Sequence, residues 1–215
     1  MAGTVEDMGL EAVGDYWNHN TAYHPWLVGL AARHRGDVLD VGCGDGLLAQ
    51  RLAPVSRSVT GIEPDPATAD RARARIGDLE DVDVSCTSFE DFDPGARRFD
   101  LVAFVASLHH MDLRTTLTRA RDLLTPTGEI AVVGLSANQS LLDWTWAACS
   151  LPVVKVADRV HGATPDIGVV LAEPRESLRT IRRTTAEVLP GAVIRRGLYY
   201  RYLLRWSSAL ASTSV

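Results

Sequence analysis

The stretch VLDVGCGDGLL at residues 38–48 decides the fold class of this chain. An apolar, strand-like run leads directly into glycines at positions 42, 44 and 46, and leucines at helical spacing follow. Glycine is needed where the backbone turns with positive φ or comes close to a ligand, and the first amides of the next helix offer hydrogen-bond donors. A dinucleotide fingerprint, G-x-G-x-x-G, would require glycine at position 47, which is leucine here. The stretch therefore predicts a strand–turn–helix ligand site that is not a pyrophosphate cradle.

A carboxylate stands at the corresponding place one step further along the chain. Glu63 ends the next strand-like run and lies 23 residues after Asp40, the span of one β–α–β step. In nucleotide-binding folds, an acid at this place accepts hydrogen bonds from the hydroxyls of a ribose. The alternative interpretation is an ordinary tight turn and a surface glutamate. The strand–turn–helix context of both elements favours the ligand site.

Strand-like and helix-like segments alternate through the first two thirds of the chain. We expect strands at residues 38–42, 58–63, 82–86, 99–105 and 129–135, with helices at 47–52, 67–76 and 112–124. Asp112 is the expected N-cap of the last of these helices, and the sequence TPTG at 125–128 is its expected stop. The alternation predicts an α/β fold with a mostly parallel sheet and helices on both faces.

The C-terminal third follows a different pattern. The sequence EPRE at 173–176 is expected to open a helix that runs to about residue 188, with proline and acids in its first turn. Two strand-like runs at 192–198 and 201–206 are separated by only two tyrosines, so they must pair antiparallel. We therefore expect a single domain over residues 1–215, with a parallel core and a C-terminal antiparallel hairpin.

Composition limits the class of function. A chain of 215 residues with net charge −5, 46% hydrophobic and 23% charged residues is typical of one globular domain and argues against a nucleic-acid partner. Its three cysteines form no C-x-x-C pair, which favours a reducing, cytoplasmic compartment over a disulfide framework or structural zinc. No apolar run is long enough to cross a membrane, and the N-terminus lacks the pattern of a secretion signal.

The motifs together resemble those of class I S-adenosylmethionine-dependent methyltransferases. Residues 40–46 (DVGCGDG) and 61–63 (GIE) are similar to the family's glycine-rich turn and ribose acid. Residues 99–102 (FDLV) and 107–111 (SLHHM) are similar to its fourth strand and the exit of that strand, and residues 123–129 (LLTPTGE) to the turn into its fifth strand. The resemblance implies a Rossmann-like seven-stranded sheet, with S-adenosylmethionine as cofactor and a small molecule as the methyl acceptor. It also implies a monomer or homodimer, and specialised metabolism is one setting in which such an enzyme works.

The resemblance also implies roles for individual residues. Asp40 would hold the amino-acid portion of the cofactor, Glu63 the ribose hydroxyls, and Pro64 or Asp65 would flank the adenine. Where the family has an aspartate that contacts the adenine amino group, this chain has Ser88, so adenine recognition would fall to Ser88 or its neighbours. The remaining cofactor-binding candidates are Gly42, Cys43 and Gly44 at the methionine end, Phe89 and Glu90 at the adenine, and Val105, Ala106 and His109 after the fourth strand.

Methyl transfer from a sulfonium is an in-line displacement that needs alignment, a dry pocket and, where the acceptor atom carries a proton, a base. His109 and His110 follow a strand whose carboxyl end borders the ligand crevice, and histidine titrates near neutrality. We expect His109 to line the cofactor pocket and His110 to be the base. The alternative is that one of them caps or packs under the next helix. Together with Asp112 they match no strong metal signature, so no metal is expected.

Two segments outside the motifs carry further candidates. Residues 1–35 are expected to form an N-terminal helical lid, with Tyr23 and His24 facing the cofactor and Tyr16 facing the substrate. The alternative is a helix that docks through Trp17, Tyr23 and Trp26. Residues 136–170 are expected to form a substrate-cap insertion, although its tryptophans would equally suit a core. The substrate candidates in that insertion are Trp144, Trp146 and His161.

Two other functions compete with methyl transfer. A nicotinamide-dependent oxidoreductase is disfavoured by the leucine at position 47, and a non-methylating cofactor-binding protein could share the fold. The exit of the fourth strand lacks Asn-Pro-Pro-Tyr, which serves amide or exocyclic-amine methylation, and no Pro-Cys pair suggests cytosine methylation. These absences favour a small-molecule acceptor.

Overall fold

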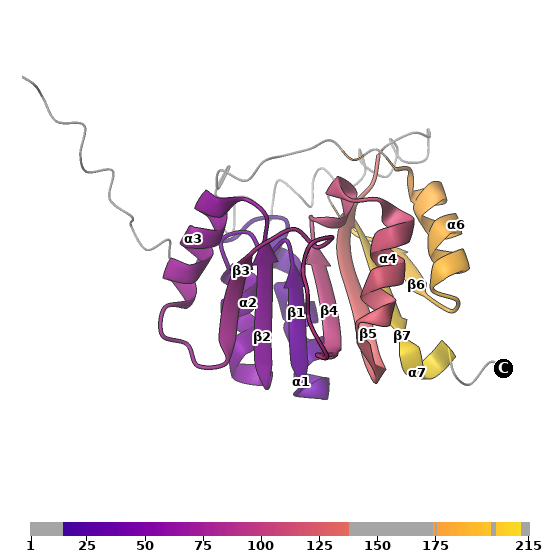
Figure 1. The fold of residues 1–215 in the computed structure, drawn as a ribbon. Helices are drawn as coiled ribbons and strands as arrows, with labels where there is room; N and C mark the ends of the chain where they lie inside the picture. The colour runs from indigo at the N-terminus through magenta and orange to yellow at the C-terminus, as the bar shows by residue number, and fades with distance from the viewer. Residues whose placement is uncertain (1–14, 138–173, 175, 199–200, 212–215) are drawn as a thin grey trace, which may run out of the picture.

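The computed structural model describes residues 15–137, 174, 176–198 and 201–211. Within these residues the chain forms a seven-stranded sheet of order β3-β2-β1-β4-β5-β7-β6 (Figure 1). Strands β1 to β5 are parallel, and β7 pairs antiparallel with both β5 and β6. The strands are β1 (Asp37–Val41), β2 (Ser58–Glu63), β3 (Val82–Cys86), β4 (Phe99–Val105), β5 (Leu124–Leu135), β6 (Val193–Arg196) and β7 (Arg201–Ser207).

Helices cover both faces of the sheet (Figure 1). On one face α1 and α2 pack over the middle strands and α3 follows beside α2, while α4 and α6 lie together on the opposite face. Short helices η1, η2 and η3 and the C-terminal α7 complete the described elements. Their bounds are η1 (Thr21–Tyr23), α1 (His24–His34), α2 (Leu47–Leu52), η2 (Ala53–Val55), α3 (Pro66–Ile76), η3 (Leu108–His110), α4 (Leu113–Asp122), α6 (Leu178–Val188) and α7 (Ser208–Ala211).

The apolar strand sequences follow from burial on both faces. Along β4, Val102 and Phe104 enter the core under α4 and α6, whereas Leu101 and Ala103 enter the core under α1 and α2. Successive side chains point to opposite faces, so a strand with helices on both sides has no solvent-facing position. This is why the central strands read as continuous apolar runs.

The expected fold class and most element positions are confirmed. Strands at 58–63, 82–86 and 99–105 have the expected bounds, and Asp112 caps α4 by accepting a hydrogen bond from the Thr115 amide at 2.9 Å. The C-terminal strands pair antiparallel as expected. The first strand is shifted by one residue, and α4 ends at Asp122 rather than at residue 124.

Two further boundaries, the start of α6 and the start of β5, are each wrong by five residues. The helix expected from residue 173 begins at Leu178, because Ser177 is its N-cap and accepts a hydrogen bond from the Thr180 amide at 3.2 Å. The expected proline and acids therefore precede the helix instead of occupying its first turn. The fifth strand begins at Leu124, so the TPTG segment belongs to β5, with a register irregularity beside it.

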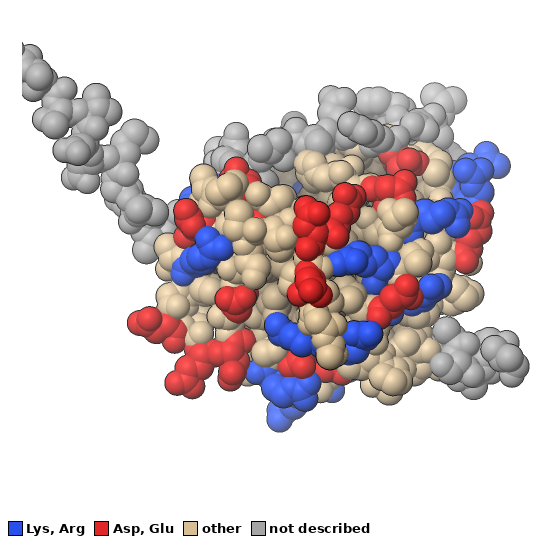
Figure 2. All heavy atoms as spheres, in the orientation of Figure 1, with Lys and Arg blue, Asp and Glu red and all other residues tan. Residues whose placement is uncertain are grey.

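Charge on the molecular surface is mixed. On the face shown in Figure 2, acidic and basic side chains are interspersed. The described residues also form exposed ion pairs such as Arg114–Glu187. This face presents no continuous basic field to a nucleic-acid backbone. Among the described residues, no helix is long and apolar enough to cross a membrane.

Candidate active site

The glycine turn after β1 has the strained geometry that its sequence predicts. Gly42 has a φ of 69° and Gly44 a φ of 57°, a region that residues with a side chain rarely occupy. A Cβ on Gly42 would lie 2.5 Å from the Cβ of Ser107, whereas a Cβ on Gly44 would meet no heavy atom within 4 Å. The turn is fixed because the Gly42 and Cys43 amides both donate to the Ile62 carbonyl of β2, at 2.9 and 3.0 Å.

Glu63 lies against this turn, as its spacing predicted. Its Oε2 accepts a hydrogen bond from the Gly44 amide at 3.1 Å, and its Oε1 accepts one from the Asp65 amide at 3.1 Å. The side chain is half-buried at the end of β2. A carboxylate is thus held beside the glycine turn with part of its surface accessible.

Asp40 is the other carboxylate of the site, and it is buried. Only 1% of the residue is exposed, and its Oδ2 atom has no hydrogen-bond partner in the part of the chain that the structure describes. Burial, together with the nearby charge of Glu63, raises the pKa of Asp40 to about 7. A buried carboxylate oxygen without a donor is costly, so this atom is suited to receive a hydrogen bond from a bound cationic group.

The exit of β4 meets the same turn. Ser107 Oγ donates to the Val41 carbonyl at 2.6 Å, and Ala106, just before it, has a φ of 52°. Such backbone strain in a residue other than glycine is concentrated at functional sites. His109 and His110 follow in η3 with ring centroids 4.1 Å apart; His109 is half-buried and His110 is exposed.

The exit of β3 is tied to that of β2 by a hydrogen bond from the Thr87 amide to the Glu63 carbonyl at 3.1 Å. Ser88 Oγ donates to Asp91 at 2.7 Å, which stabilises the turn, and Glu90 is exposed. Phe89 is only 4% exposed and packs edge-on against Phe104 in the core. The packed ring of Phe89 leaves no open face for the adenine, which argues against its expected place in the adenine site.

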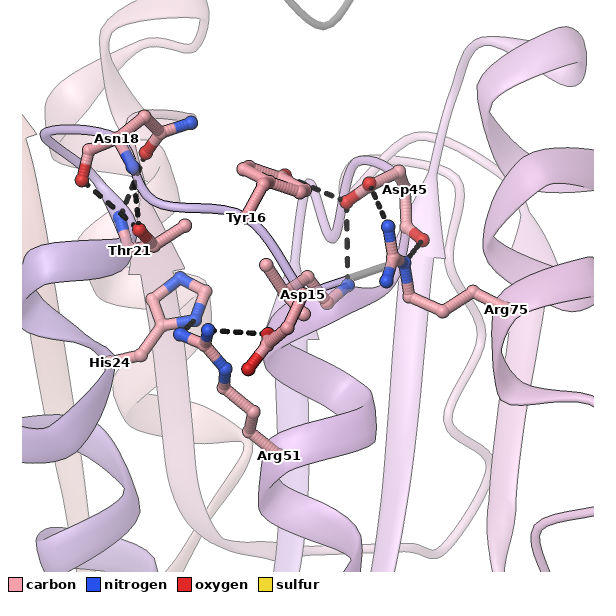
Figure 3. A network of polar contacts seen from close by, with 9 residues as sticks. Asp15, Tyr16, Asn18, Thr21, His24, Asp45, Arg51 and Arg75 are labelled. Carbon is pink, nitrogen blue, oxygen red and sulfur yellow. Dashed lines mark hydrogen bonds and ion pairs between the residues drawn. The ribbon is translucent and has the colours of Figure 1, made fainter. Parts of the chain in front are cut away.

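The N-terminal segment reaches the glycine turn through Tyr16 (Figure 3). The Tyr16 hydroxyl donates to Asp45 Oδ1 at 3.1 Å, and Arg75 of α3 pairs with Asp45 Oδ2 at 2.7 Å. Arg75 also donates to the Asp45 carbonyl at 3.0 Å, and its guanidinium lies 5.7 Å from the Tyr16 ring centroid. Burial, then the charge of Asp45, raises the pKa of Tyr16 well above its ordinary value. Tyr16 therefore contacts the glycine turn, whereas the sequence analysis placed it at the substrate.

Tyr23 and His24 are held by protein groups. His24 Nδ1 lies 3.0 Å from Arg51 Nη1, and Arg51 also pairs with Asp15 at 2.6 Å (Figure 3). Burial, then the charge of Arg51, lowers the pKa of His24 to about 3, so the ring is neutral. The Tyr23 hydroxyl accepts a hydrogen bond from the Leu198 amide at 2.9 Å, which joins the start of α1 to the segment between β6 and β7. The Tyr23 contact supports the docking alternative, and His24 is held by Arg51 rather than left open to a cofactor.

Comparison with known proteins identifies the family to which a chain with this glycine turn and sheet belongs. A family model described as a methyltransferase domain matches residues 39–130. An uncharacterized methyltransferase of Mycobacterium tuberculosis is 37% identical over 195 residues, which cover 88% of this chain and 96% of the relative. This chain belongs to the class I S-adenosylmethionine-dependent methyltransferase family. A ubiquinone biosynthesis O-methyltransferase of Bradyrhizobium diazoefficiens is 31% identical over 119 residues, which cover 54% of this chain and 44% of the relative.

Solved structures show the same fold. The N-methyltransferase NodS of Bradyrhizobium japonicum, in complex with S-adenosyl-l-homocysteine, superposes with a TM-score of 0.60 at 20% identity, covering 88% of each chain. The chain is a methyltransferase, and S-adenosylmethionine is the methyl donor of its family. The nicotinamide-dependent alternative has no support among these relatives.

A cavity of about 430 Å³ opens beside the two histidines of the methyltransferase. Its walls are η3, the first residues of α4, the end of β5 and one face of α6, and its volume lies in the usual range for small-molecule sites. A larger hollow of about 620 Å³ lies between residues 94–98 and α4, and it includes the C-terminal end of that helix. The smaller cavity lies at the carboxyl end of β5, and ligands of open α/β sheets bind at the carboxyl ends of the strands.

Some predicted residues lie beyond what the structure describes, and some contributors were missed. Trp144, Trp146 and His161, with most of the 136–170 cap and the first 14 residues of the lid, lie outside the described residues. Asp45, Arg75 and Tyr202 were not predicted. Asp45 stood inside the quoted glycine stretch, but its partner Arg75 is 30 residues away and carried no local signal. No set of three or more potential metal ligands is grouped in the described residues, and the absence of a metal stays a prediction.

Proposed function

We propose that this methyltransferase transfers the methyl group of S-adenosylmethionine to a small-molecule acceptor bound in the cavity beside η3. The observation that carries the proposal is the buried Oδ2 of Asp40, which has no hydrogen-bond partner among the described residues and lies beside a positive-φ glycine turn and next to Glu63. These groups fit the cofactor's ammonium, its close approach to the backbone and its ribose hydroxyls respectively. When bound, the cofactor supplies a methyl group already activated as a sulfonium.

The residues around this donor set divide the remaining work. The Gly42–Cys43–Gly44 backbone would accommodate the methionine portion, and Pro64, Ser88 and Glu90 would border the adenine, with Val105 and Ala106 at the β4 exit. Tyr16 and Arg75 do not need to touch the cofactor, because both act on Asp45 and so fix the turn. A fixed turn holds the donor without further loss of freedom on binding, which favours alignment.

The two histidines would serve the acceptor side. His109 is half-buried at the β4 exit, and His110 is exposed beside the cavity, where it can take a proton if the acceptor atom carries one. The similar proteins include both O- and N-methyltransferases, so they do not select the acceptor atom. We propose a biosynthetic role in specialised metabolism, in the cytoplasm, for a monomer or homodimer.

Calorimetric titration tests the cofactor assignment directly. S-adenosylmethionine and S-adenosylhomocysteine should bind the wild-type chain, and NAD should not. Glu63→Ala should weaken binding by more than about tenfold, because charge-assisted hydrogen bonds to the ribose are lost. Glu187→Ala is the matched control: Glu187 is an exposed glutamate on α6 that pairs with Arg114, and its removal should leave the dissociation constant unchanged. Binding of NAD without S-adenosylmethionine would overturn the proposal.

Product formation tests the transfer itself. The wild-type chain is incubated with S-adenosylmethionine and with panels of small phenols, amines and thiols, and S-adenosylhomocysteine is quantified. Accumulation that depends on one acceptor class supports transfer and identifies the methylated atom. Release of S-adenosylhomocysteine at the same rate with every panel and with none would show hydrolysis of the cofactor instead.

A further inference from the structure

Tyr202 is a buried residue that lines the cavity beside η3. The residue is 2% exposed and lies among the cavity-lining residues, together with Leu108, Leu135 and Ile181. Burial raises the pKa of Tyr202. No hydrogen bond of its hydroxyl is found among the residues that the structure describes, although tyrosine side chains in protein interiors usually have a partner for the hydroxyl.

Gly134 determines where the Tyr202 ring lies. The two residues are direct cross-strand partners of β5 and β7, so their side-chain positions share one face of the sheet. A Cβ on Gly134 would overlap the tip of the phenol ring, including its hydroxyl oxygen. The ring therefore lies across β5, and its hydroxyl stands one strand closer to the β4 exit than the Tyr202 backbone does.

The other lining residues determine which kind of acceptor could reach the Tyr202 hydroxyl. The apolar lining includes Leu108, Leu135 and Ile181, and the polar and charged lining includes His110, Thr180, Asp112, Arg114 and Glu176. The cavity of about 430 Å³ has room for a small acceptor whose apolar part contacts the aliphatic side chains. Because the phenol is neutral at physiological pH, it can donate a hydrogen bond as well as accept one.

We propose that the Tyr202 hydroxyl, positioned by Gly134, selects methyl acceptors that carry a hydroxyl, amine or carbonyl group on a small apolar body. This inference rests on the proposed function for the identity of the cavity. A site that bonds a substrate polar group discriminates strongly against an analogue without it, because the buried protein group then loses its partner. Tyr202 is thus a specificity-determining residue, and Gly134 acts through it.

The test compares two probes of nearly equal shape, 4-methylphenol and 1,4-dimethylbenzene, by NMR titration of wild type and Tyr202→Phe. The ratio of their dissociation constants should shift by about tenfold against the phenol in the variant. Tyr202→Phe should also be at least as stable as wild type to heat, since the Tyr202 hydroxyl makes no hydrogen bond to the part of the chain that the structure describes. An unchanged ratio, failure of both probes to bind at millimolar concentration, or a clear loss of stability would each overturn the inference.

Tyr23→Phe is the matched control. Its hydroxyl bonds the Leu198 amide, and Tyr23 does not line the cavity, so this variant should lose stability and keep the ratio. S-adenosylhomocysteine is titrated into the same proteins, and Tyr202→Phe should bind it as wild type does. If neither the wild type nor the variants bind S-adenosylhomocysteine, the proposed function fails. The ratio of the dissociation constants of the two probes still decides whether Tyr202 recognises a polar group.

Discussion

Replacing Asp40 with asparagine separates the stability of the protein from its function. Burial and the charge of Glu63 raise the pKa of Asp40 from an ordinary value of 3.8 to about 7. In the unfolded chain the carboxyl ionises near its ordinary value, so ionisation costs folding free energy as the pH rises. The difference between the two pKa values corresponds to a destabilisation of the folded state by roughly 4 kcal/mol. This destabilisation is present in full above pH 7 and is absent below the pKa of the unfolded chain.

Asp40→Asn should therefore raise the free energy of unfolding at pH 8 by roughly 2–4 kcal/mol, with the gain shrinking between pH 7 and pH 4. The same variant should weaken S-adenosylmethionine binding, because a neutral amide replaces the carboxylate that would hold the ammonium. Urea denaturation at a series of pH values, with calorimetry on the same samples, measures both effects.

Glu129 provides the comparison of opposite sign. Its side chain is also largely buried, but Arg205 binds it through two hydrogen bonds at 2.7 and 2.9 Å. Burial opposes ionisation of Glu129, yet Arg205 and the nearby Arg33 and His34 outweigh it and lower the pKa. Glu129→Gln should thus destabilise the protein at neutral pH, with the loss fading as the pH falls through the lowered pKa. If Asp40→Asn behaved like Glu129→Gln at pH 8, the reasoning about an unpartnered carboxylate would be refuted.

Two further predictions concern the histidines and the turn. His110→Ala should lower turnover more than it changes cofactor affinity, measured by S-adenosylhomocysteine release and by calorimetry; equal turnover would remove His110 from the mechanism. Arg75→Met should lower the free energy of unfolding by about 3 kcal/mol, because Asp45 keeps a buried charge without its partner. Adding Asp45→Asn to Arg75→Met should recover part of this loss in urea denaturation, and no recovery would contradict the ion-pair explanation.

The parallel core could be predicted because its signals are local. Each buried strand is a short apolar run, and each is followed by residues with turn or capping chemistry, such as the glycines at 42 to 46 or Asp112 before α4. The contact between Glu63 and the glycine turn could also be predicted, since adjacent parallel strands bring their carboxyl ends together. The resemblance to class I methyltransferases then supplied the identity of the cofactor and the roles expected of Asp40 and Glu63.

The misplaced features depend on contacts between distant residues. Phe89 reads as an exposed aromatic in a polar segment, but packing against Phe104 of β4 buries it. Tyr16 and His24 read as groups available to a ligand, but Asp45 and Arg51 bind them in the folded chain. Neither partnership leaves a periodic or spacing signal, because side-chain hydrogen bonds between separate elements have no fixed sequence distance.

Tyr202 was missed for a topological reason. In an open α/β sheet, functional residues are expected at the carboxyl ends of the strands, where parallel strands meet the ligand crevice. Strand β7 runs antiparallel to β5, with Arg201 opposite Leu135 and Ser207 opposite Glu129, so it is the beginning of β7 that reaches the same edge. The second residue of that strand, Tyr202, therefore lies where the last residues of β5 lie. The antiparallel hairpin forms one edge of the sheet, and it also places a side chain in the lining of the cavity beside η3.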